Sequence, residues 1–259
     1  MKQDLWNPEA YAKFKAERDL PFFDLLRDIE LPEGSRILDL GCGTGQLTQK
    51  LHEQLRASET LGIDNSEKML SESKAFADKG LSFRLQSIET FEPEAPYNLV
   101  FSNAALHFVT SLSQEELLAR MTQWLTPQGQ LAIHLPANHE HPSQTAACRV
   151  AGESPFQEAL GGFVRQSPVL RPEKYATLLA GLGYRKRTVR LNVYSHELPN
   201  REEVITWVKS SMLTDYQKRM PAELYDAFVN RYREVLFDEL PDRTPCIFTF
   251  NRILLWASK

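Results

Sequence analysis

The chain has 259 residues, which is enough for one large α/β domain or for a domain with a cap. Hydrophobic residues make up 42% and charged residues 25%, as in ordinary globular proteins, and these values exclude a disordered chain. The net charge of −4 provides no basic surface for nucleic acid. Three widely spaced cysteines favour reduced thiols in the cytoplasm, and no apolar run resembles a signal region or a membrane span.

The first predicted element is a helical leader from Trp6 to Arg27, which Pro21 should break into two helices. Aromatic residues and an arginine lie close together near its start, at Trp6, Tyr11 and Arg18. This grouping favours a flap over a bound ligand rather than a simple packing element.

Short apolar runs and helical segments then alternate along the chain. Alternation of this kind predicts a parallel, doubly wound α/β sheet. Ser66 has the side chain and position of a helix N-cap. Strands are expected near 37–40, 60–63, 81–85, 98–102 and 130–135, and helices near 46–55, after Ser66 and near 114–125.

The second half of the chain has a different pattern. We expect helices near 144–152 and 173–181, a long strand at 184–194 and a final strand at 246–256. Insertions near 137–170 and 199–240 should form a helical cap on what is otherwise one domain spanning 1–259. Aromatic residues at helical spacing in the second insertion fit a hydrophobic core better than a ligand site.

A glycine-rich turn follows the first predicted strand. Gly41, Gly43 and Gly45 alternate with other residues, and Gln46 stands where a dinucleotide-binding fingerprint requires its third glycine. Asp39 precedes the turn, where a carboxylate would repel a pyrophosphate and suit an ammonium group. Asp64 ends the next strand, a position suited to ribose hydroxyls. The pattern therefore disfavours a nicotinamide-dependent oxidoreductase.

These residues resemble the class I S-adenosylmethionine-dependent methyltransferases. The resemblance implies a Rossmann-like, mostly parallel seven-stranded sheet with a final antiparallel strand, and S-adenosylmethionine as the cofactor, with S-adenosylhomocysteine as its product. Ser87 departs from the acid usual at its position and would accept a hydrogen bond from the adenine without a charge. The implied cofactor-binding residues are Asp39, Gly41, Gly43, Asp64, Asn65, Met69, Ser87, Ile88 and Asn103.

The whole chain resembles the trans-aconitate 2-methyltransferase family, in motifs such as Asn103–Leu106, Leu125–Gly129 and Tyr194–Pro199. The resemblance implies a small carboxylic acid as the methyl acceptor. An ionised carboxylate needs no general base, so the rate acceleration should come from alignment of the acceptor with the methyl group and from exclusion of water. Thr214 stands where family members tend to carry an arginine, which predicts an acceptor with fewer charges than trans-aconitate.

Acceptor contacts are expected from Arg149, Tyr194 and His196, and His107 is a candidate catalytic residue. No metal is expected, because His139-Glu140-His141 lacks a further ligand at a known spacing. We expect a monomer with no nucleic-acid or membrane partner. Two alternatives stay open: methylation of a carboxylate on an acyl carrier protein, and binding of S-adenosylmethionine without catalysis.

Overall fold

The computed structural model describes residues 15–259, which form two compact units. The sheet unit contains Leu20–Pro136, Pro168–Asn192 and Arg252–Lys259. The helical unit contains 15–19, Ala137–Ser167 and Val193–Asn251. The start of the predicted leader, including Trp6 and Tyr11 of the expected flap, lies outside the described residues.

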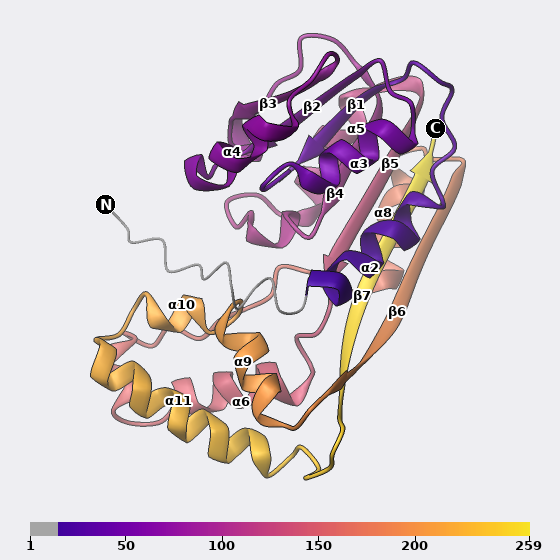
Figure 1. The fold of residues 1–259 in the computed structure, drawn as a ribbon. Coiled ribbons are helices and arrows are strands. Elements are labelled where there is room, and N and C mark those ends of the chain that lie inside the picture. Colours follow the sequence, from indigo (N-terminus) through magenta and orange to yellow (C-terminus); the bar gives the residue numbers. More distant parts are fainter. Residues whose placement is uncertain (1–14) are drawn as a thin grey trace. The chain divides into compact units, whose positions relative to one another are not determined.

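Seven strands form one sheet in the order β3-β2-β1-β4-β5-β7-β6 (Figure 1). Strand β1 pairs in parallel with β2 and β4, β4 pairs in parallel with β5, and β7 is antiparallel to β5. This topology confirms the predicted mostly parallel sheet with a final antiparallel strand. The strands are β1 (Arg36–Leu40), β2 (Glu59–Asp64), β3 (Leu81–Leu85), β4 (Tyr97–Asn103), β5 (Leu125–Pro136), β6 (Lys186–Leu198) and β7 (Cys246–Ser258).

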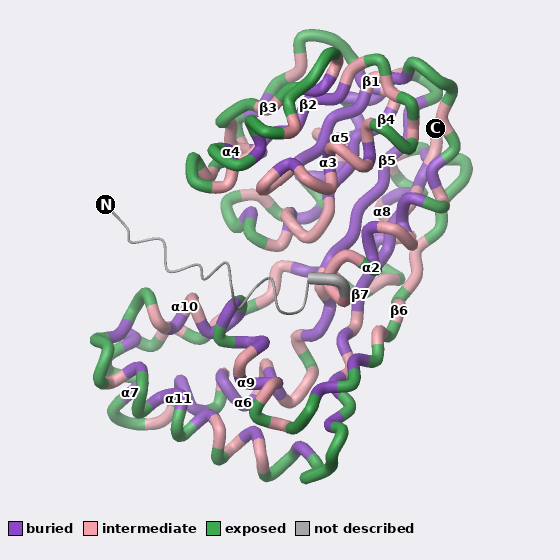
Figure 2. The backbone as a smooth tube through the Cα atoms, viewed as in Figure 1, coloured by how far each residue is buried: buried purple, intermediate pink, exposed green. Residues whose placement is uncertain are grey.

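The central strands are buried, because helices cover the sheet (Figure 2). Strand β5 begins at Leu125, ahead of the start predicted near 130, and therefore includes Pro127 and Gly129. The pairing of β4 with β5 shifts register between Tyr97 and Leu99, and this irregularity accommodates the proline and the glycine. Both β6 and β7 extend beyond their predicted ends.

Helix α2 (Lys15–Leu26) runs without interruption through Pro21, so the predicted break at this proline is wrong. Phe22 and Leu25, which follow the proline, are fully buried, and their packing outweighs the cost of the proline. Phe22 lies edge-to-face against Phe101 of β4, with ring centroids 5.6 Å apart. The other elements of this unit are α3 (Gln46–Gln54), α4 (Glu67–Ser73), α5 (Gln114–Gln123), α8 (Pro172–Gly181), and the 3-10 helices Lys74–Phe76, Ile88–Thr90 and Leu106–Phe108.

The helical unit has its own hydrophobic cluster, to which α6 (Pro142–Ala151), α9 (Glu202–Lys209) and α11 (Ala222–Phe237) contribute. The short helices α7 (Phe156–Ala159) and α10 (Thr214–Gln217) complete the unit. Trp207 and Tyr232 are buried in this cluster, which confirms that the aromatic residues of the second insertion form core. No helix within 15–259 is long and apolar enough to cross a membrane.

Candidate active site at the carboxyl edge of the sheet

The glycine turn between β1 and α3 carries three left-handed backbone conformations, at Gly41, Gly43 and Gly45. A Cβ on Gly41 would collide with Ala105, and one on Gly45 would lie 2.7 Å from the Phe83 ring. A Cβ on Gly43 would have no atom within 4 Å. Two glycines are therefore required for packing, whereas Gly43 borders open space where a ligand could approach the backbone.

Asp64, at the end of β2, joins the glycine turn to the loop that follows β2. Its Oδ2 accepts a hydrogen bond from the Gly43 amide, and its Oδ1 accepts one from the Ser66 amide, both at 2.9 Å. Each carboxylate oxygen keeps a lone pair, so the pair of oxygens can still accept hydrogen bonds from a diol. Asn65 is exposed and Met69 is half-buried. Ser66 caps α4 by accepting from the Met69 amide, as predicted.

Asp39 is buried in β1 and accepts a hydrogen bond from Thr48 Oγ1 at 2.6 Å. Burial raises the pKa of Asp39 from its ordinary value to about 7, and the charge of Asp64 adds to the increase. The bond from Thr48 acts in the opposite direction. A cation placed beside this carboxylate would favour its ionised form, so the ligand-free site suits an ammonium group.

Ser87 and Ile88 follow β3, and their surroundings reveal a residue that the sequence analysis missed. Ser87 Oγ donates a hydrogen bond to the carboxylate of Glu89 and accepts one from the Glu89 amide at 3.2 Å. Hydrogen bonds from Ser87 and Ser111 lower the pKa of Glu89. The negative charge absent at Ser87 is thus present one hydrogen bond away. Ile88 is buried.

Asn103 ends β4, and its Oδ1 lies 2.7 Å from Nδ1 of the buried His134 in β5. Burial lowers the pKa of His134 well below its ordinary value, and the charges of Arg252 and His107 act in the same direction. His107 is half-buried in the 3-10 helix after β4, and its ring centroid lies 4.0 Å from that of Phe108. His134 and Arg252 were also missed, because neither belongs to a local motif.

The three expected acceptor contacts all lie in the helical unit. Arg149 forms an ion pair with Glu239, which compensates its charge and makes it the weakest of the three candidates. Tyr194 and His196 lie on the same strand, and alternation along a strand puts them on the same face. His196 is buried and stacks on Trp207, with centroids 5.1 Å apart.

Trp207 also forms a cation–π interaction, because the Arg18 guanidinium lies 5.0 Å from its ring centroid. Arg18 Nη2 donates to Ser210 Oγ at 3.0 Å. Thr214 directs its hydroxyl to the Ser211 carbonyl, and the neighbouring Asp215 forms an ion pair with Arg165 at 2.9 Å. The acid that follows Thr214 is therefore charge-compensated within its own unit.

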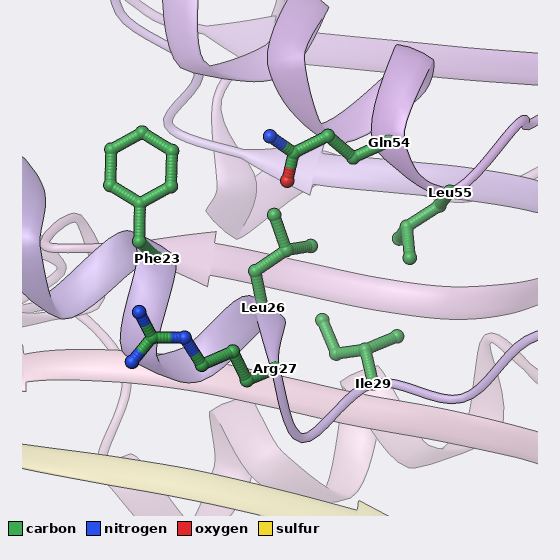
Figure 3. Close-up of a pocket in the computed structure, with 6 residues that line it drawn as sticks. All are labelled: Phe23, Leu26, Arg27, Ile29, Gln54 and Leu55. Atoms are coloured by element: carbon green, nitrogen blue, oxygen red, sulfur yellow. The ribbon is translucent and has the colours of Figure 1, made fainter.

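A pocket of about 420 Å³ lies in the sheet unit but does not coincide with the candidate site (Figure 3). It lies at the C-terminal end of α3, whereas the glycine turn precedes the N-terminal end of that helix. Its lining residues are Phe23, Leu26, Arg27, Ile29, Gln54 and Leu55.

In the segment His139-Glu140-His141, which was considered as a metal site, His141 has a structural role. His141 caps α6 by accepting from the Ser143 amide at 3.1 Å. Within 15–259, no group of three or more histidine, cysteine or acidic residues could hold a metal ion.

The residues that the structure brings together form an acidic end and a donor-rich end at one edge of the sheet. Asp39 and Asp64, at the ends of β1 and β2, suit a positive group and a diol. Asn103, at the end of β4, offers an amide beside His134. Among these residues no hydroxyl or thiol pairs with a histidine base, so the arrangement suits positioning of a ready nucleophile rather than its activation.

Comparisons with known proteins agree with this arrangement. Residues 37–129 match a family model described as a methyltransferase domain. The chain is 36% identical to a trans-aconitate 2-methyltransferase of Deinococcus radiodurans, with 98% of each chain covered. It is 33% identical to one of Variovorax paradoxus, again with 98% of each covered.

Two solved structures share the fold. The YcgJ protein of Bacillus subtilis has a TM-score of 0.62 at 14% identity, with 93% of this chain and 98% of that chain covered. The phosphoethanolamine N-methyltransferase 2 of Haemonchus contortus, solved with S-adenosylhomocysteine, has a TM-score of 0.56 at 17% identity, with 93% of this chain and 52% of that chain covered.

Proposed function

Because the chain belongs to the trans-aconitate 2-methyltransferase family, we propose that it forms a methyl ester on a carboxylate of a small, trans-aconitate-like organic acid. It is a methyltransferase that uses S-adenosylmethionine. The observation that carries the proposal is the extent of the similarity, which covers 98% of both this chain and its relatives rather than the glycine turn alone. A monomeric state, the absence of a nucleic-acid partner and a cytoplasmic location stay predictions.

The residues present fit the cofactor. Asp39 would bind the ammonium of the methionine moiety, since a cation there offsets the cost of burying the carboxylate. Asp64 would bind the ribose hydroxyls through its remaining lone pairs. The open space beside Gly43 would allow close approach to the backbone. Asn65, Met69, Ser87 and Ile88 would surround the adenine, with Glu89 orienting the Ser87 hydroxyl.

S-adenosylmethionine supplies a methyl group that is already activated by the positive sulfur. The acceptor carboxylate has an ordinary pKa near ~4 and is ionised at neutral pH, so the protein need not remove a proton. The protein instead aligns the acceptor oxygen with the methyl group, which can lower the barrier by roughly 7–11 kcal/mol in well-oriented cases. Tyr194 and His196 stay proposed acceptor contacts, and the region they belong to stays a proposed cap.

The test is a screen of mono-, di- and tricarboxylic acids for formation of S-adenosylhomocysteine, with the methyl ester identified by mass spectrometry. We expect turnover with a free small acid. Turnover only with an acid attached to a carrier protein would contradict the proposal.

The matched control is Asp64→Ala, which should weaken cofactor binding by about 1.5–3 kcal/mol through lost charge-assisted hydrogen bonds. Unchanged affinity in calorimetry would remove Asp64 from the cofactor site.

A further inference from the structure

The register of three strands brings Asn103, His134 and Arg252 to one face of the sheet. Asn103 pairs with His134 across β4 and β5, and Arg252 pairs with Pro136 across β5 and β7. Paired residues and residues two apart on a strand share a face, so the three side chains leave the sheet on the same side. Asp39 shares that side, because it pairs with Phe101, two residues before Asn103. Strands β4, β5 and β7 are neighbours in the sheet (Figure 1).

The hydrogen bond from His134 defines the orientation of the Asn103 amide. His134 is buried with 1% of its surface exposed, and the environment keeps its imidazole neutral. Its Nε2 has no partner among the described residues. A buried N–H without a partner is rarer than a buried acceptor without one, so the proton belongs on Nδ1, where it is donated to Asn103 Oδ1. The Asn103 NH₂ group is then left to donate elsewhere.

Arg252 supplies the charge that a carboxylate requires. Only 6% of this residue is exposed, and its guanidinium stays protonated even when buried. Its fork of N–H donors matches a carboxylate geometrically. Neighbouring strands lie about 4.8 Å apart, and Arg252 is also offset from Asn103 by two residues along the strands, so the two backbones are about 12 Å apart. This separation suits the two ends of a small diacid better than a single carboxylate.

We propose that Asn103 donates its amide N–H to the carboxylate that is methylated, that Arg252 binds a second carboxylate of the same acceptor, and that His134 is the positioning residue that orients Asn103. The inference rests on the proposed function and deepens it, since it specifies which residues of the sheet unit bind and orient the acceptor. It moves Asn103 from the cofactor site to the acceptor site. The carboxylate oxygen forms the new bond to the methyl carbon, and the electron pair of the broken bond stays on the cofactor sulfur.

The experiment measures binding and turnover separately. Calorimetry titrates trans-aconitate, a four-carbon diacid and its monomethyl ester into the protein saturated with S-adenosylhomocysteine. We expect Arg252→Met to weaken diacid binding at least tenfold, to leave monoester binding within threefold, and to leave S-adenosylhomocysteine affinity unchanged. Equal weakening for diacid and monoester, or no acid binding that depends on Arg252, would overturn the proposal. Arg252-dependent binding without turnover would support the subsite and contradict the proposed function instead.

The role of His134 is tested with a pair of variants. His134→Leu should lower kcat at least tenfold with unchanged S-adenosylhomocysteine affinity, and His134→Asn, whose amide can replace the Nδ1–H donor, should restore most of it. In an Asn103→Ala background the same His134→Leu change should have little further effect, because there is no amide left to orient. A purely structural histidine would produce equal losses in both backgrounds, and that result would overturn the positioning role. The S-adenosylhomocysteine affinity also reports whether each variant is folded.

Discussion

Asp39 is the residue at which burial has the clearest functional consequence. Its pKa of about 7 means that the carboxylate is only partly ionised at neutral pH in the ligand-free protein. A positive ammonium group beside it lowers that pKa, so binding and ionisation are thermodynamically linked. The same shift affects stability: the folded-state pKa lies above the ordinary value of 3.8, so the stabilisation from protonation is present at low pH and is lost as the pH rises toward 7.

We therefore expect S-adenosylhomocysteine to bind more weakly as the pH falls below 7, by up to tenfold per pH unit. Calorimetry between pH 5.5 and 8 measures this dependence, and at pH 6 proton release should appear as a difference between buffers of unlike ionisation enthalpy. Asp39→Asn is the matched control, since it keeps the shape and the bond to Thr48 but cannot titrate. A wild-type protein with the same flat pH profile as this variant would contradict the linkage.

The residues of the candidate site divide into those that a local pattern reveals and those that only the fold reveals. Asp39 and Asp64 could be predicted as ligand-binding residues because each stands at a fixed spacing from the glycine turn. Glu89 could have been noticed as an acid two residues from the departure at Ser87. His134 and Arg252 are 118 residues apart in the numbering and gain their role only from strand register, which no spacing encodes.

At the scale of elements, helices and strands were predicted well where a cap or an apolar run marks them. Ser66 as an N-cap and the bounds of β3 are examples. The break expected at Pro21 failed because the local cost of a proline was weighed without the tertiary contacts of Phe22 and Leu25. The extensions of β6 and β7 were missed for a similar reason, since pairing between distant strands sets where each ends.

The anchoring of α2 on the sheet gives a prediction for stability. Phe22→Ala should lower the free energy of unfolding by about 3–5 kcal/mol, because it removes a fully buried ring that packs edge-to-face against Phe101 and Phe23. Leu20→Ala is the matched control on the same helix: its side chain is 47% exposed, and a change of about 0.5 kcal/mol or less is expected. Urea unfolding measures both. Equal losses in the two variants would show that α2 is not held through Phe22.

The whole molecule consists of two units that are not separate along the chain. The chain passes from one unit to the other at 19/20, 136/137, 167/168, 192/193 and 251/252, so no continuous segment contains all of either unit. Helix α2 and strands β6 and β7 each contribute residues to both units. Unfolding of one unit would therefore interrupt hydrogen-bonded elements of the other, and we expect the two units to unfold as one cooperative system.

Cooperative unfolding predicts that a ligand of one unit protects the other. All the proposed cofactor residues lie in the sheet unit, yet S-adenosylhomocysteine at 100 times its dissociation constant should slow the exchange of globally protected amides about 100-fold in both units. Hydrogen-exchange mass spectrometry can compare peptides from β4, in the sheet unit, with peptides from α11, in the helical unit. Asp64→Ala at the same ligand concentration should lose most of the effect in both places, since the protection depends on binding and the variant binds about 1.5–3 kcal/mol more weakly. Slower exchange in β4 with unchanged exchange in α11 would show that the two units unfold independently, and the shared helix and strands would then have to break at the division between them.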